Sequence, residues 1–241
     1  GPHWGYRRKA RLGVRLVPKK GGILVGFREK RNSYITNLDN CMTLDHRIAR
    51  LLPSLNSLIN SLSIREKVPQ IEVAAGDRDI ALVLRHLKAF STRDQEVLVN
   101  YGQSNRIQCY LQPGGTDSIW CLTPTEVPML EYGLENGKIK IQFSPTDFTQ
   151  VNHSVNQLMV EAAVEELEPG GQDRILDLFC GVGNFSLPLA KRVAEVHGVE
   201  NVPALVDRGM KNAKLNDISN ANFEIRDLYA SSLRDWDPGR V

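Results

Sequence analysis

The chain has 241 residues, 41% of them hydrophobic and 24% charged, which are the proportions of an ordinary soluble globular protein. No apolar run approaches the roughly 20 residues that a membrane-spanning helix needs, and the first residues lack the apolar core of a signal peptide. We therefore expect a cytoplasmic protein that has no membrane partner. The four cysteines lie far apart, which favours a reducing compartment and small buried thiols over a disulfide framework.

Basic residues are concentrated at the start of the chain, although the formal net charge is only +2. Residues 1–38 contain ten Lys or Arg and a single acid, Glu29, and the remainder carries an excess of seven acids. A basic segment on an acidic body is typical of a surface that faces a polyanion.

Residues 6–16 alternate between apolar and basic side chains, the pattern of a strand whose side chains point to opposite faces. Lys19-Lys20-Gly21-Gly22 then predicts a turn, and residues 23–27 predict the returning strand. Two interpretations of the basic face stay open: a solvated strand face, or an RNA-binding face on which no interleaved acid neutralises the row. The basic residues of this face are Arg7, Lys9, Arg11 and Arg15.

Residues 44–62 carry leucine and isoleucine at helical spacing, with Pro53 bending or restarting the helix. A further helix is predicted over residues 91–99. Strands are predicted over 71–75, 80–84, 107–111, 118–122 and 138–143. Residues 1–143 are therefore expected to form a mixed α+β domain with no chemistry visible in its own right.

After Phe143 the pattern becomes that of a parallel sheet. Residues 151–167 predict one amphipathic helix, which Glu168-Pro169-Gly170-Gly171 ends. The predicted elements that follow are strand 174–179, a glycine loop, helix 184–192, strand 195–200, helix 203–216 and strand 222–226. This order predicts a second, α/β domain over residues 144–241 with ligand binding at the strand carboxyl ends. The first strand has few polar residues, which predicts cover on both faces.

The glycine loop contains Gly181 and Gly183, which let the backbone turn sharply and pass close to a ligand. Glu200 ends the next strand nineteen residues after Gly181, near the roughly 20-residue spacing at which a carboxylate accepts from ribose hydroxyls. Asp227 ends the third strand, where it could accept from an adenine amino group. For either acid alone, a solvated cap on a strand end remains the alternative.

The loop reads Gly-x-Gly-Asn-Phe and lacks the third glycine that a dinucleotide pyrophosphate requires at a helix N-terminus. A sulfonium nucleoside has no phosphate to hold. S-adenosylmethionine therefore fits this loop better than NAD.

Three segments resemble the RNA uracil-5-methyltransferases. Asp177–Leu189 is similar to the cofactor motif of that family. Phe143–Asn152, followed by Asn156, resembles the segment before the cofactor domain, and Trp4–Leu12 resembles the start of the central RNA-binding region. The resemblance is collinear over essentially the whole chain and is greatest to the iron–sulfur branch that modifies 23S ribosomal RNA. It implies a truncated Rossmann-like methyltransferase domain, holding the first three parallel strands, after a central α+β RNA-binding domain.

The resemblance also implies residue roles. Gln150 would hydrogen-bond the amino-acid end of S-adenosylmethionine, and Phe179 and Asn184 would line the loop. Glu200 would hold the ribose, and Asp227, where the family usually has an amide, would face the adenine.

Cys41 matches the fourth ligand of a 4Fe–4S cluster. The resemblance puts the three partner cysteines upstream of residue 1, so we expect the cluster only in the full-length protein.

The catalytic groups of the family are expected beyond the C-terminus. Its nucleophilic cysteine lies in a Ser-Cys-Asn-Pro segment and its base in a His-x-Glu-Ser segment, and neither occurs here. Cys180 sits within the cofactor loop and does not substitute for the nucleophile. Asp237–Arg240 resembles the Asp-Pro-Pro-Arg motif of the family, but no apolar strand precedes it, so residues 228–236 are predicted to be loop.

The first hypothesis is a fragment of an enzyme that methylates C5 of a uridine in 23S ribosomal RNA, with no obligate protein partner, the fragment itself being inactive. The alternatives are a tRNA uracil-5-methyltransferase, which Cys41 disfavours, and a non-catalytic RNA-binding module. A nicotinamide-dependent oxidoreductase is disfavoured by Asn184-Phe185 after the loop.

Overall fold

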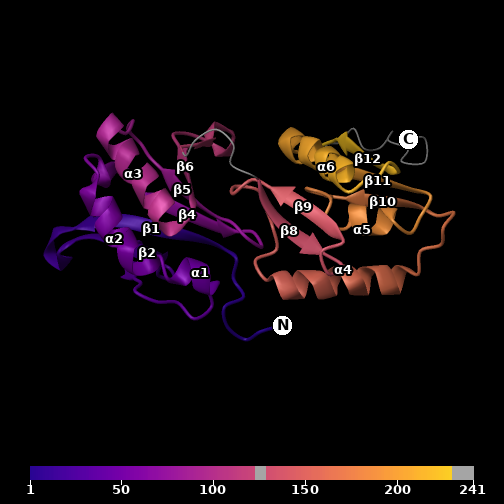
Figure 1. Cartoon of the computed structure of the whole chain (residues 1–241), viewed down its shortest axis with the longest axis horizontal. Helices are drawn as coiled ribbons and strands as arrows, with labels where there is room; N and C mark the ends of the chain where they lie inside the picture. Colours follow the sequence, from indigo (N-terminus) through magenta and orange to yellow (C-terminus); the bar gives the residue numbers. More distant parts are fainter. Residues whose placement is uncertain (123–128, 230–241) are drawn as a thin grey trace. The chain divides into compact units, whose positions relative to one another are not determined.

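The chain forms two units, and the computed structural model describes residues 1–122 and 129–229 of it (Figure 1). Unit 1 comprises Gly1–Leu130 and Ser144–His153, and unit 2 comprises Glu131–Phe143 and Ser154–Val241. The Asp237–Arg240 motif and residues 230–236 of the predicted loop lie outside the described residues. Within the described ranges, no helix has the length and apolar character that crossing a membrane requires.

Unit 1 is built on a seven-stranded sheet in the order β3-β2-β1-β4-β5-β6-β7, in which only β5 and β6 pair in parallel. The predicted hairpin is confirmed, because Val14 of β1 pairs with Val25 of β2 in antiparallel register. A short 3-10 turn connects them, and Gly21 ends it in the left-handed conformation, at φ 87°. The strands are β1 (Lys9–Val17), β2 (Gly22–Arg28), β3 (Ile35–Asn37), β4 (Gln70–Ala75), β5 (Ile80–Arg85), β6 (Gln108–Gln112) and β7 (Trp120–Cys121).

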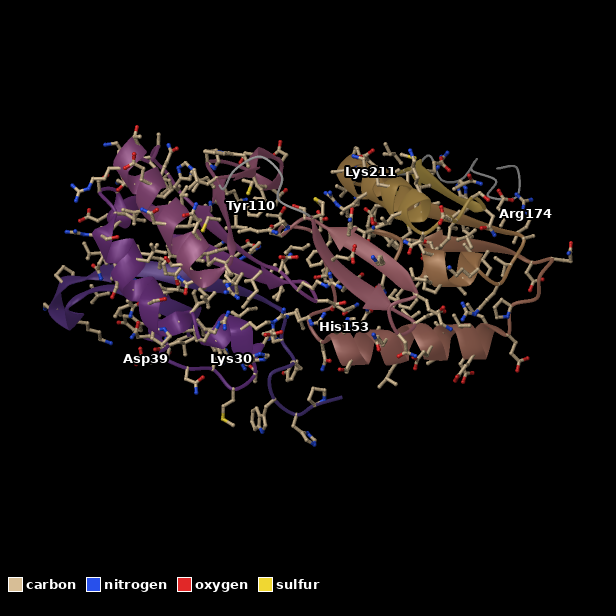
Figure 2. The ribbon with its side chains drawn as sticks, in the orientation of Figure 1. Lys30, Asp39, Tyr110, His153, Arg174 and Lys211 are labelled. Atoms are coloured by element: carbon tan, nitrogen blue, oxygen red, sulfur yellow. The ribbon has the colours of Figure 1, made fainter. Side chains whose placement is uncertain are left out.

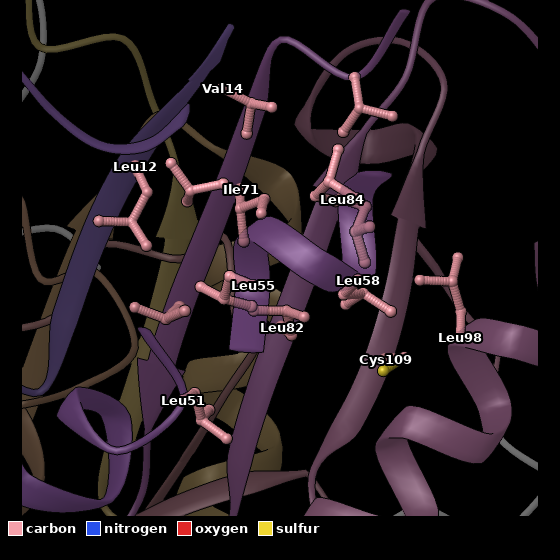
Figure 3. Close-up of a cluster of buried hydrophobic side chains, with 14 of the residues drawn as sticks. Leu12, Val14, Leu51, Leu55, Leu58, Ile71, Leu82, Leu84, Leu98 and Cys109 are labelled. Atoms are coloured by element: carbon pink, nitrogen blue, oxygen red, sulfur yellow. The ribbon is translucent and has the colours of Figure 1, made fainter. Parts of the chain in front are cut away.

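Helices α1 (His46–Ala49), α2 (Leu52–Ser61) and α3 (Thr92–Asn105) supply the other half of the unit 1 core. Pro53 restarts the helical segment as predicted, since it lies in the first turn of α2, where its missing N–H leaves no bond unmade. Figure 3 shows leucines of α2 among those of β5, with Cys109 of β6 in the same core. Each fully buried leucine stabilises the fold by about 1.5–3 kcal/mol.

Unit 2 contains the predicted β-α-β-α-β order as a three-stranded parallel sheet, β10-β11-β12. Leu178 pairs with Val199, so β10 and β11 reach their carboxyl ends at the same edge. Arg174 begins β10 at the opposite edge, where its guanidinium bonds Glu195 at 2.8 Å (Figure 2). The elements are β10 (Arg174–Leu178), α5 (Ser186–Ala190), β11 (Glu195–Glu200), α6 (Pro203–Leu215) and β12 (Ala221–Ile225).

The prediction that the first strand is covered on both faces is wrong for the described residues. Leu176 and Leu178 of β10 are 37% and 45% exposed. The chain passes from β10 to its neighbour β11 and on to β12, always toward the same side of the sheet. Right-handed crossovers in one direction place the two connecting helices, α5 and α6, on the same face. Helix α4 (His153–Leu167) forms as predicted, but it buries Asn156 and Val160 rather than the whole predicted apolar stripe.

The hairpin of β8 (Leu130–Leu134) and β9 (Ile139–Phe143) moves the unit boundary away from the predicted one after residue 143. Asn212 of α6 and Asn216, the residue that follows the helix, both pair with β9. Asn212 accepts from the Gln142 N–H at 2.9 Å and donates to its carbonyl at 3.0 Å, and Asn216 does the same to Lys140 at 2.7 Å in both directions. One helical turn, about 5.4 Å, nearly matches two strand residues, about 6.6 Å, so the amides replace a neighbouring strand.

Two glycines make room for the Phe223 ring of β12. A Cβ on Gly198 of β11 would lie 2.9 Å from the ring and 2.9 Å from the Cys180 sulfur. A Cβ on Gly209 of α6 would lie 2.8 Å from the same ring. The close approach of helix, strand and loop therefore depends on these positions having no side chain.

We predict that Gly198→Ala lowers the free energy of unfolding by about 1–3 kcal/mol, because the added methyl group overpacks this contact. Urea unfolding measures the change. Gly171→Ala is the matched control, since a Cβ there meets no atom within 4 Å. Unchanged stability of Gly198→Ala would contradict the packing described.

Candidate functional site

The loop after β10 turns through three left-handed residues: Phe179 (φ 61°), Gly181 (φ 56°) and Gly183 (φ 90°). Glycine adopts this conformation freely, whereas a phenylalanine there is held by its surroundings at a cost of about 1–3 kcal/mol. A Cβ on Gly183 would press on Leu187 at 3.1 Å, but one on Gly181 would meet nothing within 4 Å. The backbone at Gly181 is therefore open to a ligand.

Glu200 connects this loop by hydrogen bonds to the residues that precede helix α6. Its side chain is buried, and one carboxylate oxygen accepts from the Gly181 N–H at 3.2 Å. The other oxygen accepts from the N–H groups of Asn201 at 2.8 Å and Val202 at 3.1 Å, just before α6. Since each carboxylate oxygen has more than one acceptor position, Glu200 keeps capacity for a ligand hydroxyl.

Asn184 is held by a buried hydrogen-bond network that the sequence analysis did not foresee. Its amide exchanges two hydrogen bonds with the Asn156 amide of α4, at 2.9 and 3.0 Å. The Tyr132 hydroxyl of β8 also donates to Asn184 Oδ1 at 2.8 Å. Asn156 and Tyr132 are buried, and burial raises the Tyr132 pKa far above its ordinary value, so the hydroxyl remains a donor. The network fixes the start of the loop helix.

Phe179 and Asp227 lie at the ends of β10 and β12. The Phe179 ring is 53% exposed, and its centroid is 5.6 Å from that of Tyr229, a neighbour that the sequence analysis missed. Asp227 is exposed and accepts from the Tyr229 N–H at 2.9 Å. The structure thus brings six predicted residues to the strand ends of unit 2. We call them the strand-end site: Phe179, Gly181, Gly183, Asn184, Glu200 and Asp227.

Two acidic groups of the motif that opens the loop remain protonated more readily than usual. Burial raises the pKa of Asp177 against the opposing hydrogen bond from Ser186, whose hydroxyl lies 2.5 Å away. Burial likewise raises the pKa of the Cys180 thiol well above its ordinary range. A protonated thiol is a poor nucleophile, and the expectation that Cys180 does not take that role stays a prediction.

Gln150 is the one predicted cofactor residue that belongs to unit 1, because the segment 144–153 is bonded there. The Arg8 N–H, for instance, donates to the Val151 carbonyl at 2.8 Å. Its role toward a cofactor stays a prediction.

No acid is interleaved in β1 itself, but a carboxylate reaches its basic face from the neighbouring strand. Glu72 of β4 lies opposite Arg11 in the sheet register and binds its guanidinium at 2.8 Å. The Lys9 ammonium donates to the Asp147 carbonyl, and burial lowers the Lys9 pKa. Sequence alternation could not reveal these partners, which are 61 and 138 residues away in the chain.

Arg7 and Arg15, the other two basic residues of this face, donate to backbone carbonyls of neighbouring segments. Arg7 is half-buried, and its N–H donates to the Thr43 carbonyl at 2.9 Å. Arg15 is exposed at the far end of β1 and donates to the Ser33 carbonyl at 3.0 Å.

Cys41 is half-buried in unit 1, with its sulfur 3.2 Å from the Thr43 hydroxyl oxygen. Burial opposes ionisation of this thiol, but hydrogen bonds with Thr43 and Leu44 and the charge of Arg7 give it a pKa below the ordinary value. Nowhere in residues 1–122 and 129–229 do three His, Cys, Asp or Glu side chains gather as a metal site. A 4Fe–4S cluster takes four ligands, so these residues alone do not fit one.

A family model described as tRNA (Uracil-5-)-methyltransferase matches residues 5–233. The chain belongs to this family. Among curated members, the 23S rRNA (uracil(1939)-C(5))-methyltransferase RlmD of Nitrosococcus oceani is 50% identical over 228 residues, which are 95% of this chain and 51% of that protein. The protein of the same name from Azoarcus sp. is 47% identical over 230 residues, covering 95% of this chain and 53% of the relative. The chain thus spans about half the length of these relatives.

The fold of the uracil-5-methyltransferase family is also seen in a solved structure. The Pyrococcus abyssi tRNA (uracil-54, C5)-methyltransferase, in complex with S-adenosyl-L-homocysteine, superposes with a TM-score of 0.71 at 18% identity. The match covers 94% of this chain and 56% of that one. It confirms the predicted fold class.

We predict that Tyr132→Phe speeds amide hydrogen exchange in residues 181–187 by about fivefold, because losing one buried hydrogen bond costs about 1 kcal/mol of local stability. Exchange followed by mass spectrometry measures it. Tyr110→Phe is the control: it removes a hydroxyl bond of 2.9 Å to Gln108 in unit 1 and should leave this loop unchanged. Equal effects of the two substitutions would contradict the role given to Tyr132.

Proposed function

We propose that this chain is part of an enzyme that transfers a methyl group from S-adenosylmethionine to C5 of a uridine in 23S ribosomal RNA. The observation that carries the proposal is the strand-end site, where the open backbone of Gly181 lies beside the buried Glu200 carboxylate. The relatives from Nitrosococcus oceani and Azoarcus sp., named for 23S rRNA, support the ribosomal substrate. A cytoplasmic location accords with such a substrate.

The strand-end site suits an adenosyl sulfonium better than a dinucleotide. Its two carboxylates, Glu200 and Asp227, would repel a pyrophosphate and attract a positive sulfur. Helix α5, which follows the loop, has only five residues and offers a weak dipole to a phosphate. S-adenosylmethionine, when bound, supplies an electrophilic methyl group.

Each residue of the strand-end site has a proposed task. Glu200 accepts from the ribose hydroxyls while its backbone bonds keep the carboxylate in place. Asp227 accepts from the adenine amino group, and the exposed Phe179 ring gives the adenosyl group an apolar surface. Asn184 lines the loop in an orientation set by Asn156. Gln150 binds the amino-acid end, a role supported by the motif resemblance alone.

Attack on C6 of uracil requires a thiolate, and the buried cysteines of this chain do not provide one. Burial raises the pKa of the Cys109 thiol to about 12 and that of Cys180 further, so both stay protonated at neutral pH. We place the nucleophile and the base in the remainder of the enzyme, so residues 1–241 alone would bind the methyl donor without methylating.

Two finer assignments are also proposals. Unit 1 would bind the RNA, because its first 38 residues carry the excess of basic side chains. Cys41 would donate one thiolate to a 4Fe–4S cluster whose other ligands lie outside residues 1–241. The alternative is a tRNA substrate, which the name of the Pyrococcus abyssi enzyme states. The sequence identity of this chain is higher to the relative named for 23S rRNA, 50% against 18%, and this disfavours the alternative.

We predict that Glu200→Gln weakens binding of S-adenosylhomocysteine by about 5- to 150-fold, the effect of about 1–3 kcal/mol. The glutamine carbonyl can still accept from Asn201 and Val202, but its amino group can accept neither from a ribose hydroxyl nor from the Gly181 N–H. Isothermal titration calorimetry measures the affinity.

Glu195→Gln, at the amino end of the same strand, is the matched control and should bind as the unchanged chain does. The thermal midpoint of each variant separates loss of affinity from loss of fold. An unchanged affinity for Glu200→Gln in a folded chain would remove the ribose assignment.

A further inference from the structure

A cavity of about 460 Å³ lies at the turn between β1 and β2, wholly within unit 1. The segment between β2 and β3 folds back over the hairpin, where Ser33 accepts from Arg15 and the Ile35 side chain packs on Gly13, 2.9 Å from the position of a Cβ. Leu24, opposite Arg15 in the register, and Leu16 complete an apolar floor. This volume is in the range of small-ligand pockets, about 300–1,000 Å³.

The charges that line this cavity are all positive. Arg15, Lys19 and Lys20 line it, and no carboxylate does. Glu29 is the acid of the neighbouring segment, and its carboxylate is bonded by the Asn32 amide at 3.0 Å and the Thr36 hydroxyl at 3.3 Å. The cavity thus keeps the cationic character that Glu72 removes further along the same strand face.

Tyr34 presents an aromatic ring at the cavity. Its side chain is 66% exposed, yet its backbone is fixed: its carbonyl accepts from the Glu29 N–H at 3.0 Å, and its N–H donates to Asn32 Oδ1 at 2.7 Å. An exposed ring on a fixed turn contributes contact area at little entropic cost. Lys30 and Arg31 lie exposed in the same turn (Lys30 in Figure 2).

An apolar floor, an exposed aromatic ring and three cations without an acid match the chemistry of a nucleotide. Unpaired bases stack on aromatic side chains, and their phosphates attract Lys and Arg. An acidic peptide would use the cations but not the flat ring and the apolar floor.

We propose that this cavity binds one unpaired nucleotide of an RNA, with its base against Tyr34 and Leu24 and its flanking phosphates at Lys19, Lys20 and Arg15. The proposal rests on the proposed function in requiring an RNA substrate. It adds that unit 1 recognises a single-stranded segment through the hairpin end rather than through the whole basic face of β1.

The test is fluorescence anisotropy of the chain with a labelled oligouridine of about 12 nucleotides, a length that fits single-strand sites, over a series of salt concentrations. Tyr34→Ala is expected to weaken binding by about 5- to 150-fold with an unchanged salt slope, because base stacking is lost. Tyr34→Phe should retain the affinity. Lys19→Ala with Lys20→Ala should reduce the salt slope by about 1.4, the value for two single-strand phosphates.

Two matched controls keep the test specific. Trp120→Ala removes another exposed aromatic of unit 1, from β7, and Arg93→Ala removes an exposed cation from α3. Neither should change the affinity appreciably. Duplex RNA and polyglutamate serve as competing probes.

The proposal is overturned if Tyr34→Ala binds oligouridine as tightly as the unchanged chain, or if duplex RNA or polyglutamate shows the same Tyr34 dependence. Binding of S-adenosylhomocysteine by the same preparation distinguishes failure of the nucleotide site from failure of the proposed function. If the cofactor binds but the Tyr34 effect is absent, the nucleotide site fails while the proposed function stands. If neither the cofactor nor RNA binds, both fail.

Discussion

The Glu200 carboxylate is the contact on which the strand-end site depends, because it joins the loop after β10 to the connection between β11 and α6. It ends β11, bonds the Gly181 N–H of the loop after β10, and bonds the N–H groups that precede α6. A buried carboxylate without such donors would cost several kcal/mol, so the loop and the helix must take these positions together. The same arrangement leaves the Gly181 backbone open, which connects the stability of the loop to its capacity for a ligand.

Paired amides organise the surroundings of that loop. Asn184 and Asn156 satisfy each other, with Tyr132 as a third partner, and Asn212 satisfies β9 and the Val182 carbonyl of the loop. Buried polar groups are stable only when their partners are in place, so these networks specify one arrangement of hairpin, helix and loop. This explains why residues 131–143 belong to unit 2 although they precede the segment 144–153 of unit 1.

Local patterns predicted much of this molecule, and long-range pairing accounts for the remainder. The β1–β2 hairpin, the restart at Pro53 and the parallel order after residue 174 follow from periodicity and from proline and glycine chemistry, which act over a few residues. Strand β8 and the Tyr132 bond to Asn184 were not predicted, since 52 residues separate the partners. The pairing of Arg11 with Glu72 was missed for the same reason. It neutralises Arg11 in the middle of β1, whereas no carboxylate lines the cavity at the hairpin end.

The central claim is that the backbone of the Gly181–Gly183 loop lies against an adenosyl cofactor. Proton–nitrogen correlation spectra of the labelled chain during titration with S-adenosylhomocysteine test it most directly. We predict saturable shifts of the Gly181 and Gly183 amides, with those of Gly170 and Gly171 unchanged, and no such shifts with NAD. The claim would be contradicted if the chemical shifts of these loop amides did not change with S-adenosylhomocysteine, or if they changed equally with NAD.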